Sequence, residues 1–137
     1  MRFVDSNVFV YALLSSRRPL SSRDADLKNR AKHILGRLDS EKMVTTVCHV
    51  SEVANIFEEV AGTEAAANVV RGILASENLS VAPVSPDDYF VAAEISSECG
   101  IGLNDALAVK VLRDRGVSEI YSFDRDFDKV PAVKRLQ

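Results

Sequence analysis

The chain is poor in several residues and patterns that would point to a particular kind of protein. It holds two cysteines, Cys48 and Cys99. These are too few for a disulfide framework or a cysteine metal site, so we interpret both as small buried thiols. No apolar run approaches the roughly 18 residues of a membrane span, and no charged segment followed by an apolar signal core opens the chain. We therefore expect a cytoplasmic protein.

A positive net charge is also absent, since the formal net charge is −3 at pH 7. No overall basic field marks nucleic acid as the partner. Carboxylates gathered around a metal would lower the total charge, however, and a local basic rim could still bind nucleic acid. We interpret the two histidines, His33 and His49, as structural or surface residues. With 137 residues, 47% apolar and 27% charged, the chain is expected to form one globular domain over residues 1–137.

Short apolar or β-branched runs alternate with longer segments of helical periodicity. Such alternation is typical of a parallel sheet covered by helices on both faces, so we predict an α/β fold. The expected strands are residues 3–4, 43–46, 79–84, 119–123 and 130–136, and the expected helices begin near residues 8, 23, 47, 63, 85 and 103. The helix over residues 47–61 is expected to bury Val50, Val53, Ala54, Phe57, Val60 and Ala61.

The segment Arg2–Val10 carries one acid, Asp5, directly after the first expected strand. Ligands of open α/β sheets bind in the crevice beyond the carboxyl ends of the strands, and an acid at this place faces that crevice. A simpler role is also open, because Asp5 or Ser6 could cap the helix that follows. The arrival of other carboxylates at the same edge would favour the first role.

Three further acids take comparable places along the chain. Asp124 follows the fourth expected strand, and Asp105 lies at the start of a helix that it or Asn104 could cap. Glu52 lies in the helix after the second strand. Because strand ends and helix starts converge on one edge of such a sheet, these residues predict an acidic pocket there.

Glu52 is the acid whose position is least determined by periodicity. At about 100° per residue it lies off the apolar face of its helix, although Cys48 and Ile56, one turn on either side, are apolar. An error of one turn would favour Glu58 or Glu59, which lie farther from the strand end.

Several carboxylates at one edge would repel one another. Two of them about 4 Å apart repel by roughly 4 kcal/mol at an effective dielectric constant near 20. A cation would relieve this repulsion, and oxygen ligands without histidine or cysteine suit Mg²⁺ or Mn²⁺. Such a cation can activate water and stabilise the leaving oxygen in phosphodiester hydrolysis.

Basic residues are richest over residues 17–37. Arg17 and Arg18 lie in a serine-rich loop, and Arg23 opens a strongly charged helix. Arg125 directly follows Asp124. We nominate these four arginines as contacts for the phosphates of a substrate. A solvated helix face, or for Arg125 a charge that offsets the neighbouring acids, is the alternative.

Four segments in order resemble the acidic motifs of PIN-domain ribonucleases, particularly the VapC-like toxins of toxin–antitoxin pairs. They are Val4-Asp5-Ser6-Asn7-Val8, Ser51-Glu52-Val53, Leu103-Asn104-Asp105-Ala106-Leu107-Ala108 and Ser122-Phe123-Asp124-Arg125-Asp126-Phe127-Asp128. The resemblance implies a three-layer α/β/α sandwich around a parallel sheet and endonucleolytic cleavage of RNA with Mg²⁺ or Mn²⁺.

The same resemblance implies roles for particular residues and partners. The metal-coordinating acids would be Asp5, Glu52, Asp105 and Asp124, with Asn7 and Ser122 as supporting polar groups. Asp126 or Asp128 could add a metal contact or cap the turn that carries Asp124. Toxins of this family often form homodimers and are silenced by a small antitoxin whose tail occupies the active-site groove.

Other functions fit parts of the pattern. A haloacid-dehalogenase-like phosphatase would need a second aspartate where Asn7 stands, and a receiver module would need clustered acids near the first strand. A PIN-like fold that binds RNA or protein with little turnover, or an RNA-processing nuclease outside a toxin system, fits better. Cleavage that EDTA abolishes would exclude the binding module.

Overall fold

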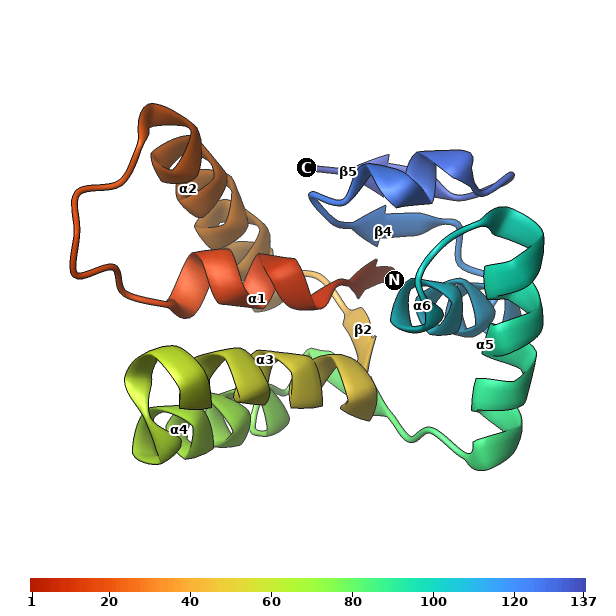
Figure 1. Cartoon of the computed structure of the whole chain (residues 1–137), viewed down its shortest axis with the longest axis horizontal. Coiled ribbons are helices and arrows are strands. Elements are labelled where there is room, and N and C mark those ends of the chain that lie inside the picture. Colours follow the sequence, from red (N-terminus) through yellow and green to blue (C-terminus); the bar gives the residue numbers. More distant parts are fainter.

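Short strands and longer helices alternate along the chain in the computed structural model, which describes residues 1–137 (Figure 1). The strands are β1 (Arg2–Val4), β2 (Met43–Thr46), β3 (Leu79–Ala82), β4 (Glu119–Tyr121) and β5 (Lys134–Leu136). The α-helices are α1 (Ser6–Leu13), α2 (Ser22–Gly36), α3 (Val47–Ala61), α4 (Thr63–Leu74), α5 (Pro86–Cys99) and α6 (Leu103–Asp114). Two 3₁₀ helices, η1 (Arg37–Asp39) and η2 (Arg125–Lys129), complete the chain.

All five strands form one parallel sheet in the order β3-β2-β1-β4-β5. Alternate residues of each strand face opposite layers, as the pleat requires. Phe3, Val44 and Ile120 belong to the core beneath α5 and α6, whereas their neighbours Val4 and Tyr121 belong to the core beneath α1–α4. Figure 1 shows these two groups of helices apart from each other. The predicted three-layer α/β/α sandwich is therefore confirmed.

The parallel arrangement places the carboxyl ends of the strands, and the helix starts that follow them, at one edge. Asp5 caps α1 directly after β1, and Thr46 caps α3 directly after β2. Ser85 caps α5 in a capping box with Asp88, and Pro86 occupies the first position of the helix. The cap of α6 is Gly102, which makes no side-chain bond; neither Asn104 nor Asp105 caps this helix.

The structure corrects several sequence expectations. Three strands are shorter than expected, and residues 130–133, expected in the last strand, form a turn before β5. Val60 is 55% exposed and Ala61 is also exposed, because α3 extends past the sheet and its last turn leaves the core. Cys48 and Cys99 are half-buried at the margin of the core. None of the helices combines the length and apolar character needed to cross a membrane.

Candidate metal centre

Asp5 is the most enclosed acid of the sheet edge, with 4% of its surface exposed. Its Oδ1 accepts the backbone N–H of Ser6 at 2.7 Å, which is the helix cap. Its Oδ2 accepts the hydroxyl of Ser122 at 2.6 Å and the side-chain amide of Asn7 at 2.8 Å. Both roles considered for Asp5 are therefore compatible, because the carboxylate that caps α1 is also held in a buried polar network.

Ser122 and Asn7 connect this network to the loop after β4. The Asn7 amide also donates to Ser122 Oγ at 3.2 Å, and Ser122 Oγ accepts the backbone N–H of Asp124 at 3.0 Å. The side-chain oxygen of Asn7 accepts the backbone N–H of Phe123 at 3.3 Å. The two residues named as supporting groups thus link the ends of β1 and β4 and fix the loop that carries Asp124.

Asp124, Asp126 and Asp105 form a cluster in which one carboxylate oxygen of each lies within 4.8 Å of the others. Asp124 caps η2 by accepting the backbone N–H of Asp126 at 2.9 Å. Asp126 also pairs with Lys129 at 2.7 Å. Asp128, by contrast, pairs with Arg135 at 2.9 Å through two bonds and is not a member of the cluster.

The electrostatic environment of Asp105 shows that the acids act on one another. Burial and, in decreasing order of importance, the charges of Asp5, Asp124, Glu52 and Asp126 together raise the pKa of Asp105 to about 7. Burial likewise raises the pKa of Asp5, against the opposing influence of His49 and the Ser122 hydrogen bond. The arrangement concentrates negative charge that a cation would neutralise.

Glu52 reaches this edge although its helical phase favoured the surface. Its Oε1 accepts the side-chain amide of Asn104 at 2.8 Å, and Asn104 Oδ1 accepts the hydroxyl of Tyr89 at 2.6 Å. Glu52 lines a cavity of about 410 Å³ with Tyr89, Gly102, Leu103, Asn104 and Asp105. Glu58 and Glu59, the alternatives one to two turns further along α3, are exposed and are not among these residues.

Three residues that contact the acids of the site were not predicted as site residues from the sequence. Asn104 and Tyr89 orient Glu52, and the only signal for Asn104 was its place beside Asp105. His49 is completely buried, and its Nε2 lies 3.9 Å from Asp5 Oδ1. The spacing of three residues between His49 and Glu52 was the available signal, since residues three apart share a helix face.

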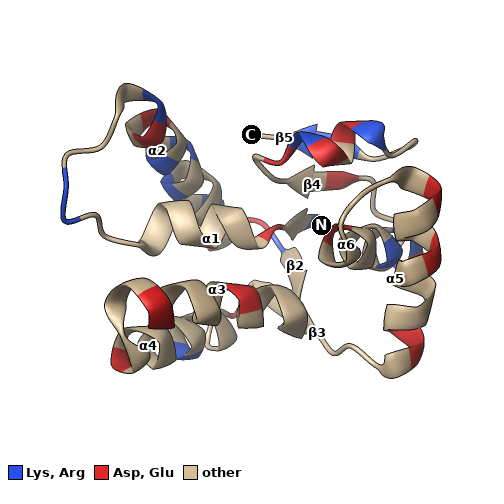
Figure 2. Ribbon diagram, in the orientation of Figure 1, with Lys and Arg blue, Asp and Glu red and all other residues tan.

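The nominated arginines lie in two places. Arg125 is exposed beside Asp124 at the edge of the acidic cluster. Arg17, Arg18 and Arg23 lie beyond the far end of α1, on the α1–α2 loop and the start of α2, where Figure 2 shows basic residues gathered. Because the eight residues of α1 extend about 12 Å from the end capped by Asp5, this basic region is separate from the acids.

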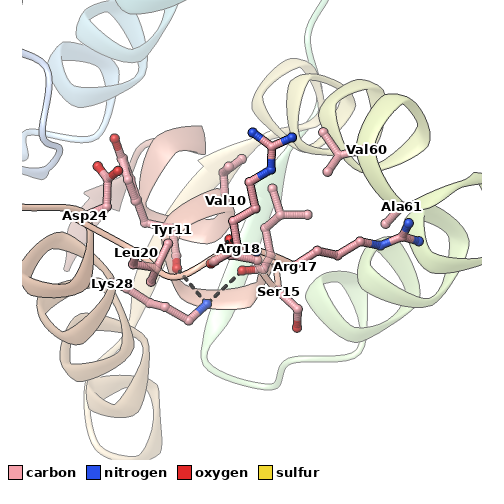
Figure 3. A pocket seen from close by; sticks show the side chains of 12 residues that line it. Val10, Tyr11, Ser15, Arg17, Arg18, Leu20, Asp24, Lys28, Val60 and Ala61 are labelled. Carbon is pink, nitrogen blue, oxygen red and sulfur yellow. Dashed lines mark hydrogen bonds between the residues drawn. The ribbon is translucent and has the colours of Figure 1, made fainter.

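A larger cavity of about 610 Å³ adjoins this loop (Figure 3). Arg17 and Arg18 line it together with Val60 and Ala61 of α3. The ammonium group of Lys28 donates to the carbonyl oxygens of Leu14 at 2.7 Å and Tyr11 at 3.3 Å. It thereby supplies hydrogen-bond donors to the carboxyl end of α1. The cavity combines apolar walls with two free guanidinium groups.

The donor set at the sheet edge fits a hard divalent cation. All the clustered side chains supply carboxylate oxygens, and among them only Asp126 is paired with a basic residue, Lys129. The pKa of Asp105 is raised by burial and by four neighbouring acids. Oxygen-only ligation of this kind suits Mg²⁺ or Mn²⁺.

A family model described as PIN domain matches residues 2–133, and the chain therefore belongs to the PIN domain family. The resemblance seen in the acidic motifs is thus confirmed. No curated protein matches the chain.

Solved structures of toxins share the fold. VapC20 from Mycobacterium tuberculosis, described as a toxin that cleaves the sarcin–ricin loop, is 21% identical with a TM-score of 0.75, and 93% of each chain is covered. A toxin–antitoxin complex from Klebsiella pneumoniae is 17% identical with a TM-score of 0.66, covering 98% of this chain and 96% of that chain. VapBC2 from Rickettsia felis, bound to a DNA fragment from its promoter, is 15% identical with a TM-score of 0.66 and the same coverage.

Proposed function

We propose that this chain is a metal-dependent endoribonuclease and the toxin of a type II toxin–antitoxin pair. The observation that carries the proposal is the cluster of Asp105, Asp124 and Asp126 beside Asp5 and Glu52, whose mutual repulsion calls for a cation. Membership of the PIN domain family and the shared fold of VapC toxins support it.

The proposed ligands of the cation are Asp5, Glu52, Asp105 and Asp124, with Asp126 as a further candidate. A bound Mg²⁺ or Mn²⁺ would supply an activated water and neutralise charge on the cleaved phosphodiester. The chain's own contribution is to hold these carboxylates in place. Ser122 and Asn7 bind Asp5, and Asn104 holds Glu52.

The test is cleavage of a mixed single-stranded RNA pool by the purified chain. We expect cleavage with Mg²⁺ or Mn²⁺, none with EDTA, and none by an Asp105→Asn variant prepared in parallel. Cleavage that persists in EDTA would refute the metal-dependent mechanism. RNA retention without cleavage in any metal would favour the alternative of a binding module.

The toxin assignment is tested separately, by induced expression in a bacterial host. Growth arrest by the wild-type chain, absent with Asp105→Asn, is the expected result. Cleavage in vitro without any effect on growth would favour an RNA-processing nuclease outside a toxin system.

The same proposal includes a cytoplasmic location, a small antitoxin as partner and a homodimeric state. Light scattering of the purified chain measures whether it is a homodimer.

The loop arginines give a prediction about the RNA path. Replacement of Arg17 and Arg18 by alanine should weaken RNA binding and lower the slope of log affinity against log salt by up to about 1.4, since each phosphate contact to a single strand contributes about 0.7. Titration at several salt concentrations measures this slope. The matched control replaces Arg113 and Arg115, exposed at the far end of α6, by alanine.

An unchanged salt slope in the Arg17 and Arg18 variant would remove the loop from the RNA path. An equal loss in the Arg113 and Arg115 control would show that net charge, rather than the loop, governs binding.

A further inference from the structure

A buried histidine lies against the most enclosed acid of the site. His49, in the first turn of α3, has 0% of its surface exposed, and its ring packs against the ring of Phe3 in a T-shaped arrangement with centroids 5.0 Å apart. A polar side chain so buried is normally fully hydrogen-bonded. One nitrogen, Nε2, has no hydrogen-bond partner. The expectation of a structural or surface residue leaves this nitrogen unexplained.

The other ring nitrogen is paired with the helix cap. Nδ1 lies 2.7 Å from Thr46 Oγ1, and Thr46 Oγ1 also accepts the backbone N–H of His49 at 3.2 Å. A threonine hydroxyl has one proton, and Nδ1 is the one acceptor with which Thr46 Oγ1 makes a hydrogen bond. The arrangement that uses this proton has Thr46 donating to Nδ1. Nε2 then carries the proton of the neutral ring.

The Nε2–H group faces the carboxylate of Asp5. Nε2 lies 3.9 Å from Asp5 Oδ1, and both groups are almost fully buried, so solvent screens their interaction little. The other partners of Asp5, namely Ser6, Asn7 and Ser122, come from the α1 and β4 sides. From α3, Nε2 of His49 lies against Asp5, and the charge of Glu52 also acts on Asp5.

We propose that His49 is a positioning residue for Asp5, with its tautomer set by Thr46 and its Nε2–H directed at the carboxylate. The proposal rests on the proposed function, in which Asp5 binds the cation. Polar groups behind a metal ligand orient it, and their loss typically weakens metal binding about 10- to 100-fold. The 3.9 Å separation is longer than a hydrogen bond, so we expect the lower end of that range.

The test compares His49→Gln with His49→Asn by calorimetric titration of the metal-free chain with Mn²⁺. A glutamine amide nitrogen can reach the place of Nε2, whereas an asparagine amide reaches only that of Nδ1. We expect His49→Gln to bind Mn²⁺ within about threefold of the wild type and His49→Asn to bind about tenfold more weakly. Circular dichroism and thermal melting establish that each variant folds.

The tautomer is measured on a chain that keeps His49. In a His33→Gln background His49 is the one remaining histidine, and nitrogen NMR then reports a protonated Nε2 and an unprotonated Nδ1. Thr46→Ser should keep this tautomer, and Thr46→Val should give a mixture of tautomers. This measurement does not depend on whether the His49 variants fold.

Undiminished Mn²⁺ binding by a folded His49→Asn variant, or a proton found on Nδ1, would overturn the proposal while leaving the nuclease assignment intact. A wild-type chain that binds neither Mn²⁺ nor Mg²⁺ would overturn the proposed function, and the role of His49 with it.

Discussion

Replacement of Asp105 by asparagine is expected to abolish metal-dependent cleavage while making the metal-free protein more stable at pH 8. Asp105 is only partly buried, yet burial and then the charges of four neighbouring acids hold its pKa near 7. Its ionised form is therefore unfavourable in the folded chain. Asparagine has the same shape and no charge, so the variant removes this repulsion together with the proposed metal ligand.

The expected gain in stability of Asp105→Asn is estimated from the pKa shift of Asp105. The difference between a pKa of about 7 and the ordinary pKa of 3.8 corresponds to roughly 4 kcal/mol when solvent screening is ignored. Solvent screening at this partly exposed carboxylate reduces the figure to about 1–2 kcal/mol, or about 5 °C in melting temperature for a chain of this size. Loss of the cation's charge stabilisation should lower the cleavage rate by about 100-fold or more.

The direction of the pKa shift predicts how the stability of the metal-free protein changes with pH. The folded pKa of Asp105 is raised, so its contribution to stability is fully present below about pH 4 and is lost as the pH rises to about 7. Metal-free wild-type protein should therefore lose stability over this range relative to Asp105→Asn, and saturating Mg²⁺ should restore it. Thermal melts from pH 4 to 8 in EDTA and in Mg²⁺ measure both effects.

Asp39→Asn is the matched control, because Asp39 is an exposed acid outside the cluster. It should change neither cleavage nor the pH profile. Equal stability of Asp105→Asn and the wild type in EDTA at pH 8 would show that the acids do not repel one another as the structure indicates.

Asp5→Asn should have the opposite effect on stability, although it too should abolish cleavage. An asparagine amide in place of Oδ2 would meet the donating amide of Asn7 and leave the Ser122 hydroxyl proton without its acceptor. Unpaired buried polar groups cost about 1–3 kcal/mol each. We expect a net loss of about 2 kcal/mol in the free energy of unfolding, measured in urea at pH 7 without metal.

The contrast between the two variants separates their roles. A stable, inactive Asp105→Asn and a destabilised, inactive Asp5→Asn would fit an acid that only binds the cation and an acid that also holds the sheet edge together. An Asp5→Asn variant as stable as the wild type would contradict the hydrogen-bond network of Ser122 and Asn7. Full cleavage activity in either variant would remove that residue from the proposed site.

The capping and packing patterns explain why much of the fold was predictable. The alternation of strands and helices is local, and so are the signals of Ser85 and Pro86 that begin α5. Asp5 and Asp124 follow strands directly, and parallel strands bring their carboxyl ends to one edge. The ends of β4 and β5 were less predictable, because pairing with neighbouring strands decides where a short strand stops.

The sequence by itself determined the fold class, the family and the acids that follow strands, because these depend on local periodicity and on the order of motifs. Only the tertiary structure decided the position of Glu52, whose carboxylate on α3 accepts a hydrogen bond from Asn104 on α6. It also decided that Asp128 forms an ion pair with Arg135, and that His49 lies against Asp5. These contacts join residues far apart in the chain, and the packing of separate elements, rather than any local pattern, sets their distances.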